Sequence, residues 1–187
     1  MKQAIYNFVV FSSIINKMNK TKLLTLSSMF LALGIIMPQT FHTIPNAGSI
    51  FLPMHIPVLL CGFICGPLYG LIVGILTPTI SHLIFSMPTS MILSQMIIEL
   101  GIYGFSSGLL CNLIRIQNEL IKNYFVLVLS MLLGRFIYGI ANALIFKVGS
   151  YSFSLWISVA FVTSIPGILI QLILIPFLVK TLNKLLR

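Results

Sequence analysis

A carboxyl group deep inside an apolar run constrains this chain more than any other feature. Glu99 lies in a long apolar stretch, and the 187 residues hold only one other acidic residue, Glu119, and no Asp. Charged residues make up 7% of the chain and the mean hydropathy is +1.10, which indicates an integral membrane protein. A charged side chain at bilayer depth costs roughly 2.5 to 3.5 kcal/mol on insertion scales. Glu99 must therefore face protein or a water-filled cavity, and it needs a partner.

The apolar runs predict an all-α integral membrane protein with six transmembrane helices in one bundle. We place the spans at about residues 23–37, 51–65, 68–85, 90–114, 124–146 and 153–179. Gly66-Pro67 and Met87-Pro88-Thr89 are expected to reverse the chain, and residues 115–123 to form a polar loop. Residues 1–17 are too short an apolar stretch to span and lack a small-residue cleavage site. We interpret them as an N-terminal extension or surface segment, ahead of a membrane-embedded domain at 18–187.

The basic residues predict how the bundle is oriented. Lys147 alone falls on one side of the predicted spans and Arg135 falls inside the membrane. The other bases fall on the opposite side: Lys2, Lys17, Lys20, Lys22, Arg115, Lys122, Lys180, Lys184 and Arg187. The positive-inside rule then places both termini in the cytoplasm of a bacterial cell. It also accounts for the net charge of +9 without a nucleic-acid partner.

Small residues recur every four positions in several predicted spans. Gly62, Gly66, Gly70 and Gly74 form one such series, split between two helices by the turn at Pro67, and Gly104 and Gly108 repeat the spacing. In lipid this pattern lets helix backbones approach closely, so we expect the glycines to pack the bundle. Ser28 and Ala32 repeat the spacing in the first span and could equally meet another protein.

Two polar stripes are expected to face each other. Gln95, Glu99 and Tyr103 share one face of the fourth span, and Arg135, Tyr138 and Asn142 share one face of the fifth. Consecutive antiparallel helices are usually neighbours, so Glu99 and Arg135 can pair. One interpretation is a ligand chamber that opens toward the outer side. The other is a structural salt bridge that locks two helices together.

The remaining reactive residues form no recognisable motif. His42, His55 and His82 are expected near the outer rim, without the spacing of a metal site, and no cofactor is indicated. Their distance from a mid-bilayer Glu99 argues against an intramembrane enzyme. His55 lies between Pro53 and Pro57, and such irregular backbone at membrane depth usually lines a cavity.

Other side chains have plainer interpretations. Trp156 is expected to anchor the interface, although it could stack on a ligand. Gln171 could line the inner face of the sixth helix. The cysteines read as small apolar fillers, and no phosphate-binding loop is present, so the chain does not hydrolyse ATP by one.

Three segments resemble a known family. The run from Phe51 to Gly70, FLPMHIPVLLCGFICGPLYG, is similar to the second-helix region of substrate-binding S components of energy-coupling factor (ECF) transporters. The segment from Glu99 to Gly108 and the pair Gly134-Arg135 also resemble that family. The resemblance covers about residues 18–187. It implies a six-helix subunit that captures a vitamin at the outer face, lacks its own ATPase, and works with a transmembrane coupling subunit and two ABC-type ATPases.

The resemblance also implies residue roles. Ser28 and Ala32 match the small-residue motif that contacts the coupling subunit, although Ser replaces the family's first Ala. The family's binding region carries over to Gln95, Glu99, Arg135, Tyr138 and Asn142, with His55 and Asn46 on the loop side. Pantothenate is a plausible substrate, and folate, pyridoxine and cobalamin remain open. The alternatives are a structural or assembly membrane protein held by the Glu99–Arg135 pair, and an intramembrane enzyme.

Overall fold

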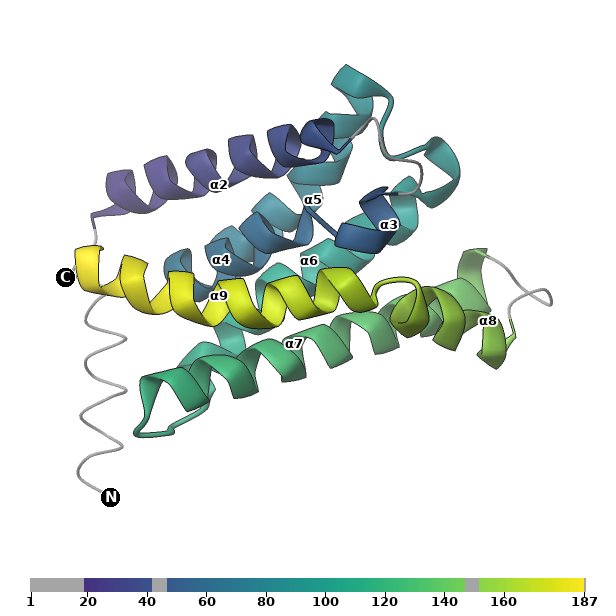
Figure 1. The fold of residues 1–187 in the computed structure, drawn as a ribbon. Helices are drawn as coiled ribbons and strands as arrows, with labels where there is room; N and C mark the ends of the chain where they lie inside the picture. Colours follow the sequence, from purple (N-terminus) through teal and green to yellow (C-terminus); the bar gives the residue numbers. More distant parts are fainter. Residues whose placement is uncertain (1–18, 42–46, 147–151, 187) are drawn as a thin grey trace.

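The computed structural model describes residues 19–41, 47–146 and 152–186, and every regular element within these ranges is a helix. Six of the helical segments are long and apolar enough to cross a membrane, as the sequence predicts. Figure 1 shows the long helices side by side. The elements are α2 (Lys20–Thr40), α3 (Ala47–Phe51), α4 (His55–Cys65), α5 (Pro67–Phe85), α6 (Ser90–Leu113), α7 (Glu119–Ala141), the π-helical turn η1 (Asn142–Phe146), α8 (Phe153–Ile157), the π-helical turn η2 (Ser158–Val162) and α9 (Ile165–Leu186).

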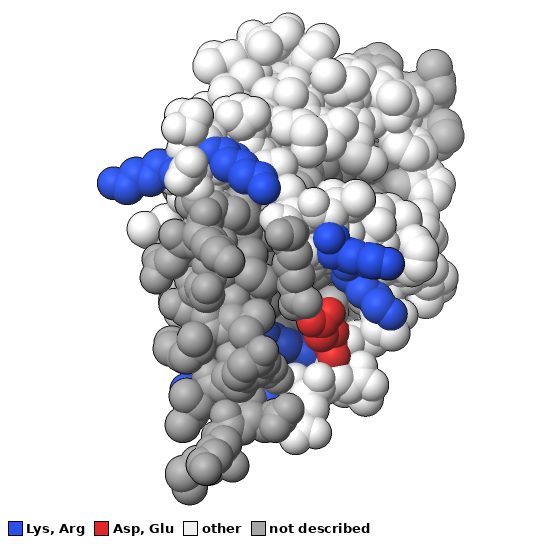
Figure 2. Space-filling model, turned by 90° about the vertical axis from the view of Figure 1, so that its left-hand side faces the viewer, with Lys and Arg blue, Asp and Glu red and all other residues white. Residues whose placement is uncertain are grey.

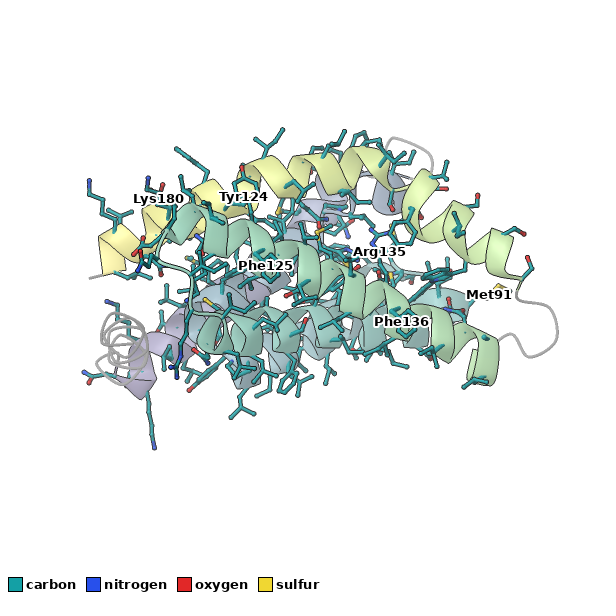
Figure 3. The ribbon with its side chains drawn as sticks, turned by 90° about the horizontal axis from the view of Figure 1, so that it is seen from below. Met91, Tyr124, Phe125, Arg135, Phe136 and Lys180 are labelled. Atoms are coloured by element: carbon teal, nitrogen blue, oxygen red, sulfur yellow. The ribbon has the colours of Figure 1, made fainter. Side chains whose placement is uncertain are left out.

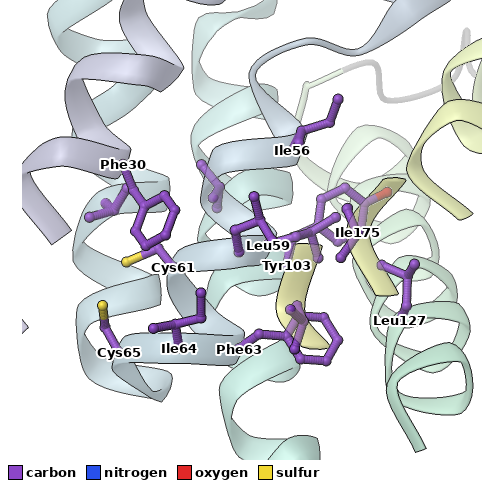
Figure 4. Close-up of a cluster of buried hydrophobic side chains, with 14 of the residues drawn as sticks. Phe30, Ile56, Leu59, Cys61, Phe63, Ile64, Cys65, Tyr103, Leu127 and Ile175 are labelled. Atoms are coloured by element: carbon purple, nitrogen blue, oxygen red, sulfur yellow. The ribbon is translucent and has the colours of Figure 1, made fainter. Parts of the chain in front are cut away.

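Helix α4 is the centre of the bundle. All of its residues are buried, and it contacts α2, α5, α6 and α9. Figure 4 shows side chains from several helices converging on it, among them Phe30 from α2, Tyr103 from α6 and Ile175 from α9. Cys61 and Cys65 are free, buried thiols of α4, in agreement with their interpretation as apolar fillers.

The glycine series packs three helices, as predicted. A Cβ atom on Gly70 of α5 would collide with the backbone of Gly104 in α6, and one on Gly104 would collide with Gly70. Gly62 of α4 lies against the same Gly104 carbonyl and against the Ser107 side chain. Gly66 makes the reversal between α4 and α5 with a φ of 94°, in the region that glycine adopts without strain. The backbones of α4, α5 and α6 therefore touch directly.

Two predicted spans are broken in the structure. Within the second span, placed at about 51–65, α3 ends at Phe51 and α4 begins at His55, which is the irregular backbone expected between Pro53 and Pro57. Leu52 between them has a φ of 51°, and Pro53 follows it, so neither residue continues a helix there. The sixth span was expected over 153–179, but it divides into α8, η2 and α9.

The helix starts explain the revised boundaries. Helix α9 begins at Ile165 with Pro166 in its first turn, where the missing N–H of proline costs nothing. Helix α7 begins at Glu119 and not near Tyr124, because the Asn118 side chain accepts hydrogen bonds from the backbone N–H groups of Leu120 (3.0 Å) and Ile121 (3.5 Å). The predicted polar loop is correspondingly shorter.

Basic side chains gather at one end of the bundle. Helix α2 begins and α9 ends there, and Lys22 Nζ donates to the carbonyl oxygen of Leu186 at 3.5 Å. Figure 2 views this end and shows the blue side chains with one red patch. Apart from Arg135, the lysines and arginines of the described residues all lie at this end: Lys20, Lys22, Arg115, Lys122, Lys180 and Lys184.

The contact between α5 and α6 generates a stability prediction. Replacing Gly104 by Val should destabilise the bundle by about 1 to 3 kcal/mol, because the added side chain meets backbone that cannot move aside. Thermal unfolding of the detergent-purified protein measures the effect. Gly48→Ala is the matched control, since nothing lies within 4 Å of a Cβ at that position. Equal melting temperatures for both variants would contradict the packing described here.

Candidate functional site

The two predicted polar stripes do face each other. Tyr138 of α7 donates from its hydroxyl to Gln95 Oε1 of α6 at 3.5 Å. Along α6, the hydroxyl of Tyr103 donates to Glu99 Oε1 at 3.0 Å, as their spacing of four residues allows. Gln95 and Tyr103 are buried. The helical period therefore brings an amide, a carboxylate and two phenols together between α6 and α7.

His55 completes the carboxylate's surroundings from α4. Its Nε2 lies 3.8 Å from Glu99 Oε1, and its ring centroid lies 5.2 Å from that of Tyr103. This position corrects the expectation that the histidine lies at the outer rim, far from Glu99. The break at Leu52 places His55 at the first residue of a buried helix. Both ring nitrogens are buried and have no hydrogen-bond partner among the described residues.

Arg135 enters the same region from α7. The side chain is 3% exposed, and its Nη1 donates to Ser164 Oγ at 2.8 Å. The expected direct pair with Glu99 does not form: within the described part of the chain, the basic group that lies within 4.0 Å of the carboxylate is the His55 imidazole, at 3.8 Å. Arg135 is still close enough to act electrostatically on both Glu99 and Tyr103. Figure 3 shows Arg135 between the two ends of the bundle, which are marked by Met91 and Lys180.

Aromatic side chains lie around the guanidinium. Arg135 Cζ lies 5.5 Å from the ring centroid of Phe161, and Trp156 packs edge-on against Phe161 at 5.6 Å. The indole Nε1 of Trp156 donates to the backbone oxygen of Arg135 at 3.1 Å. Trp156 is half-buried and packs on α7 at Gly139.

Sequence reasoning missed Ser164 and Phe161. Both lie in an apolar run that reads as the interior of one long helix, and no motif marks them. The one available signal is Pro166, which marks a helix start in which Ser164 immediately precedes the first residue.

Two buried amides have half of their hydrogen-bonding capacity unused. Asn142 donates from Nδ2 to the Tyr138 oxygen at 2.9 Å, and Gln171 donates from Nε2 to the Leu52 oxygen at 3.5 Å. Their side-chain oxygens are buried without a partner among the described residues. The buried position of Gln171 agrees with its expected place on the inner face of the sixth helix.

The other sequence candidates lie elsewhere. His82 Nδ1 lies 2.6 Å from the Pro88 oxygen, so this histidine joins the turn between α5 and α6. Asn46 and His42 fall outside the described residues. Within the described residues, no group of three His, Cys, Asp or Glu side chains is placed to hold a metal.

The arrangement can recognise a small polar molecule through opposite charges. A guanidinium presents donors to a carboxylate, and a carboxylate with its neighbouring imidazole and amides presents partners to hydroxyl and amide groups. Buried polar atoms are normally hydrogen-bonded in folded proteins. The unpartnered atoms of His55, Arg135 and Asn142 are therefore able to bind a ligand or water.

The comparison with known families identifies what kind of protein carries this site. The family model described as "ECF transporter, substrate-specific component" matches residues 22–179. The chain belongs to this family. It is accordingly a multi-pass membrane protein and a transporter subunit without catalytic activity. No curated protein and no solved structure matches the chain.

Removing the hydroxyl that donates to Glu99 should lower the free energy of unfolding of this ECF substrate-specific component. Tyr103→Phe deletes the 3.0 Å hydrogen bond, so the Glu99 carboxylate loses one hydrogen-bond donor. The expected loss of unfolding free energy is about 1 to 3 kcal/mol, measured by denaturant or thermal unfolding in detergent. Tyr124→Phe is the control, because Tyr124 lies on the exposed face of α7. A Tyr103→Phe protein as stable as this control would contradict the proposed importance of the bond.

Proposed function

We propose that this subunit captures pantothenate for ATP-driven uptake by partner subunits. The observation that carries the proposal is the buried guanidinium of Arg135, whose Nε has no partner among the described residues. A buried guanidinium without a carboxylate bound to it directly fits an anionic ligand group, and pantothenate carries one carboxylate. Family membership supports the transport role, and the chemistry of the site supports the choice of ligand.

The rest of the site suits the remainder of such a molecule. Pantothenate also carries two hydroxyl groups and an amide. Glu99 accepts hydrogen bonds from hydroxyls, and Gln95, Asn142 and His55 offer both donors and acceptors. Asn142 Oδ1 and the ring nitrogens of His55 are buried without partners among the described residues. The charged Arg135 thus matches the carboxylate of pantothenate, and the polar side chains around it match its hydroxyl and amide groups.

The orientation that we propose in the membrane is supported by the charges at the ends of the bundle. The end that carries Lys20, Lys22, Lys180 and Lys184 is expected to face the cytoplasm by the positive-inside rule. In that orientation the breaks before α4 and α9 lie toward the outer side, and ligand would enter from there. We propose that the outer loops close over the ligand. We further propose that the whole subunit topples within the membrane to release it inward.

The proposed partners are a transmembrane coupling subunit and two ABC-type ATPases. Ser28 and Ala32 are both exposed, on a face of α2 that also exposes Thr21 and Thr25. None of these residues packs the bundle itself, so this small-residue stripe is free to receive another helix. We propose that it docks on the coupling subunit.

A ligand screen tests the capture role. Pantothenate at 100 times its dissociation constant should stabilise the detergent-purified protein by about 2.7 kcal/mol, which raises its melting temperature. Folate, pyridoxine and cobalamin form the comparison panel. Arg135→Ala should abolish the shift, whereas Arg115→Ala, at the basic end of the bundle, should leave it unchanged.

The outcomes separate the candidate substrates. A shift with another vitamin and none with pantothenate would reassign the substrate. A pantothenate shift that persists in a folded Arg135→Ala protein would remove Arg135 from the site. Glu99→Gln should weaken binding less than Arg135→Ala, because the amide still accepts one hydrogen bond.

Docking generates a separate prediction. Ala32→Trp should block co-purification with the coupling subunit and abolish uptake in cells, while the vitamin-induced melting shift stays intact. The bulky ring would hold the partner helix away from α2. Ile173→Trp is the control, since Ile173 is exposed on α9. Normal assembly of the Ala32→Trp protein would place the coupling interface elsewhere.

A further inference from the structure

We propose that Ser164 and Phe161 are positioning residues that aim the guanidinium of Arg135 at the ligand carboxylate. The inference rests on the proposed function, and it assigns a role to the segment between α8 and α9. Neither side chain needs to touch the ligand. Their contacts with Arg135 fix which edge of the guanidinium remains available.

The hydrogen bond to Ser164 selects that edge. A guanidinium is planar and offers its donors in fixed directions, in pairs that match the two oxygens of a carboxylate. Arg135 Nη1 is engaged by Ser164 Oγ at 2.8 Å, and both side chains are buried. Nε is buried and has no partner among the described residues. Nε, on the edge of the guanidinium away from Nη1, is therefore a buried donor left to bind a ligand carboxylate.

Phe161 fixes the plane of the group. Its ring centroid lies 5.5 Å from Arg135 Cζ, within the range of a cation–π contact. Such a contact restrains tilting of the guanidinium, while the bond to Ser164 restrains its rotation. Trp156, from the preceding helix α8, holds the Arg135 backbone through the 3.1 Å bond from its Nε1. Residues 156–164 thus contact Arg135 at three places: its backbone oxygen, the face of its guanidinium and one edge of that group.

A hydroxyl suits this task better than a carboxylate would. An acidic residue at position 164 would orient Arg135 equally well, but its negative charge would oppose a ligand anion. Ser164 orients the guanidinium and leaves its positive charge uncancelled. The guanidinium is therefore held in one orientation and keeps its attraction for a carboxylate.

Two ligands that differ only at the carboxyl end test the inference. Panthenol is the alcohol that corresponds to pantothenate. Ser164→Ala should weaken pantothenate binding roughly tenfold, because the aimed charged hydrogen bonds lose their orientation. Panthenol, which has no carboxylate to be aimed at, should bind the variant and the wild-type protein alike. Ser164→Thr keeps the hydroxyl and should restore pantothenate binding.

Ser130→Ala is the matched control. Ser130 is equally buried, but its hydroxyl donates to the Val126 oxygen of its own helix at 2.7 Å. Isothermal titration of the four proteins with both ligands gives the comparison. Equal losses for pantothenate and panthenol in Ser164→Ala would show a merely structural role and would overturn the inference.

A readout without ligand keeps the inference separate from the proposed function. The chain holds three arginines, Arg115, Arg135 and Arg187, so isotope-labelled arginine side chains can be followed individually by NMR in micelles. The Nη protons of Arg135 should give separate, slowly exchanging signals in wild type and in Ser130→Ala. They should merge in Ser164→Ala.

The two experiments fail in distinguishable ways. If the Arg135 signals are unchanged in Ser164→Ala, the positioning role is wrong whatever the ligand. If the signals merge but wild type binds no pantothenate, the proposed substrate is wrong and the positioning role stands.

Discussion

The direct contact of the α5 and α6 backbones at Gly70 and Gly104 decides where the polar groups of the site lie. Lipid gives apolar helices no reason to associate, so close packing has to hold them together. Gly62 brings α4 against the same Gly104 carbonyl. His55 lies about two helical turns before Gly62, and Glu99 lies a similar distance before Ser107, which Gly62 also meets. The glycine contact thus sets His55 and Glu99 at the same level.

The helical period accounts for the part of the site that the sequence predicts. Residues four apart on α6 and three or four apart on α7 had to share a face, and the short connection made the two helices neighbours. The bond from Tyr138 to Gln95 confirms that geometry. The glycine packing follows from the same spacing rule. Residue spacing can be read directly from one sequence, so these contacts could be predicted without a structure.

The immediate partners of the two charges could not be predicted in the same way. Glu99 meets His55 and Arg135 meets Ser164; His55 follows a helix break and Ser164 lies within one. Hydropathy does not register such breaks, since Leu52 and Ile165 are as apolar as the helix on either side. Irregular backbone at membrane depth needs other groups to satisfy it. The Leu52 oxygen accepts from the His55 N–H at 3.1 Å and from Gln171 Nε2 at 3.5 Å, so the break and the buried amide form one arrangement.

The site keeps its two charges apart. A direct Glu99–Arg135 bridge would have satisfied both groups at the expense of their attraction for anything else. Instead a hydroxyl and an aromatic ring hold Arg135, and a phenol and an imidazole lie against Glu99. Arg135 is thus oriented by uncharged groups, without a direct bridge to Glu99. Hydrogen bonding to a charged group is strongest in surroundings of low polarity, so the buried guanidinium attracts a carboxylate more than an exposed one would. The same burial makes the unpartnered donors costly, and a ligand that supplies the missing acceptors therefore stabilises the bundle as it binds.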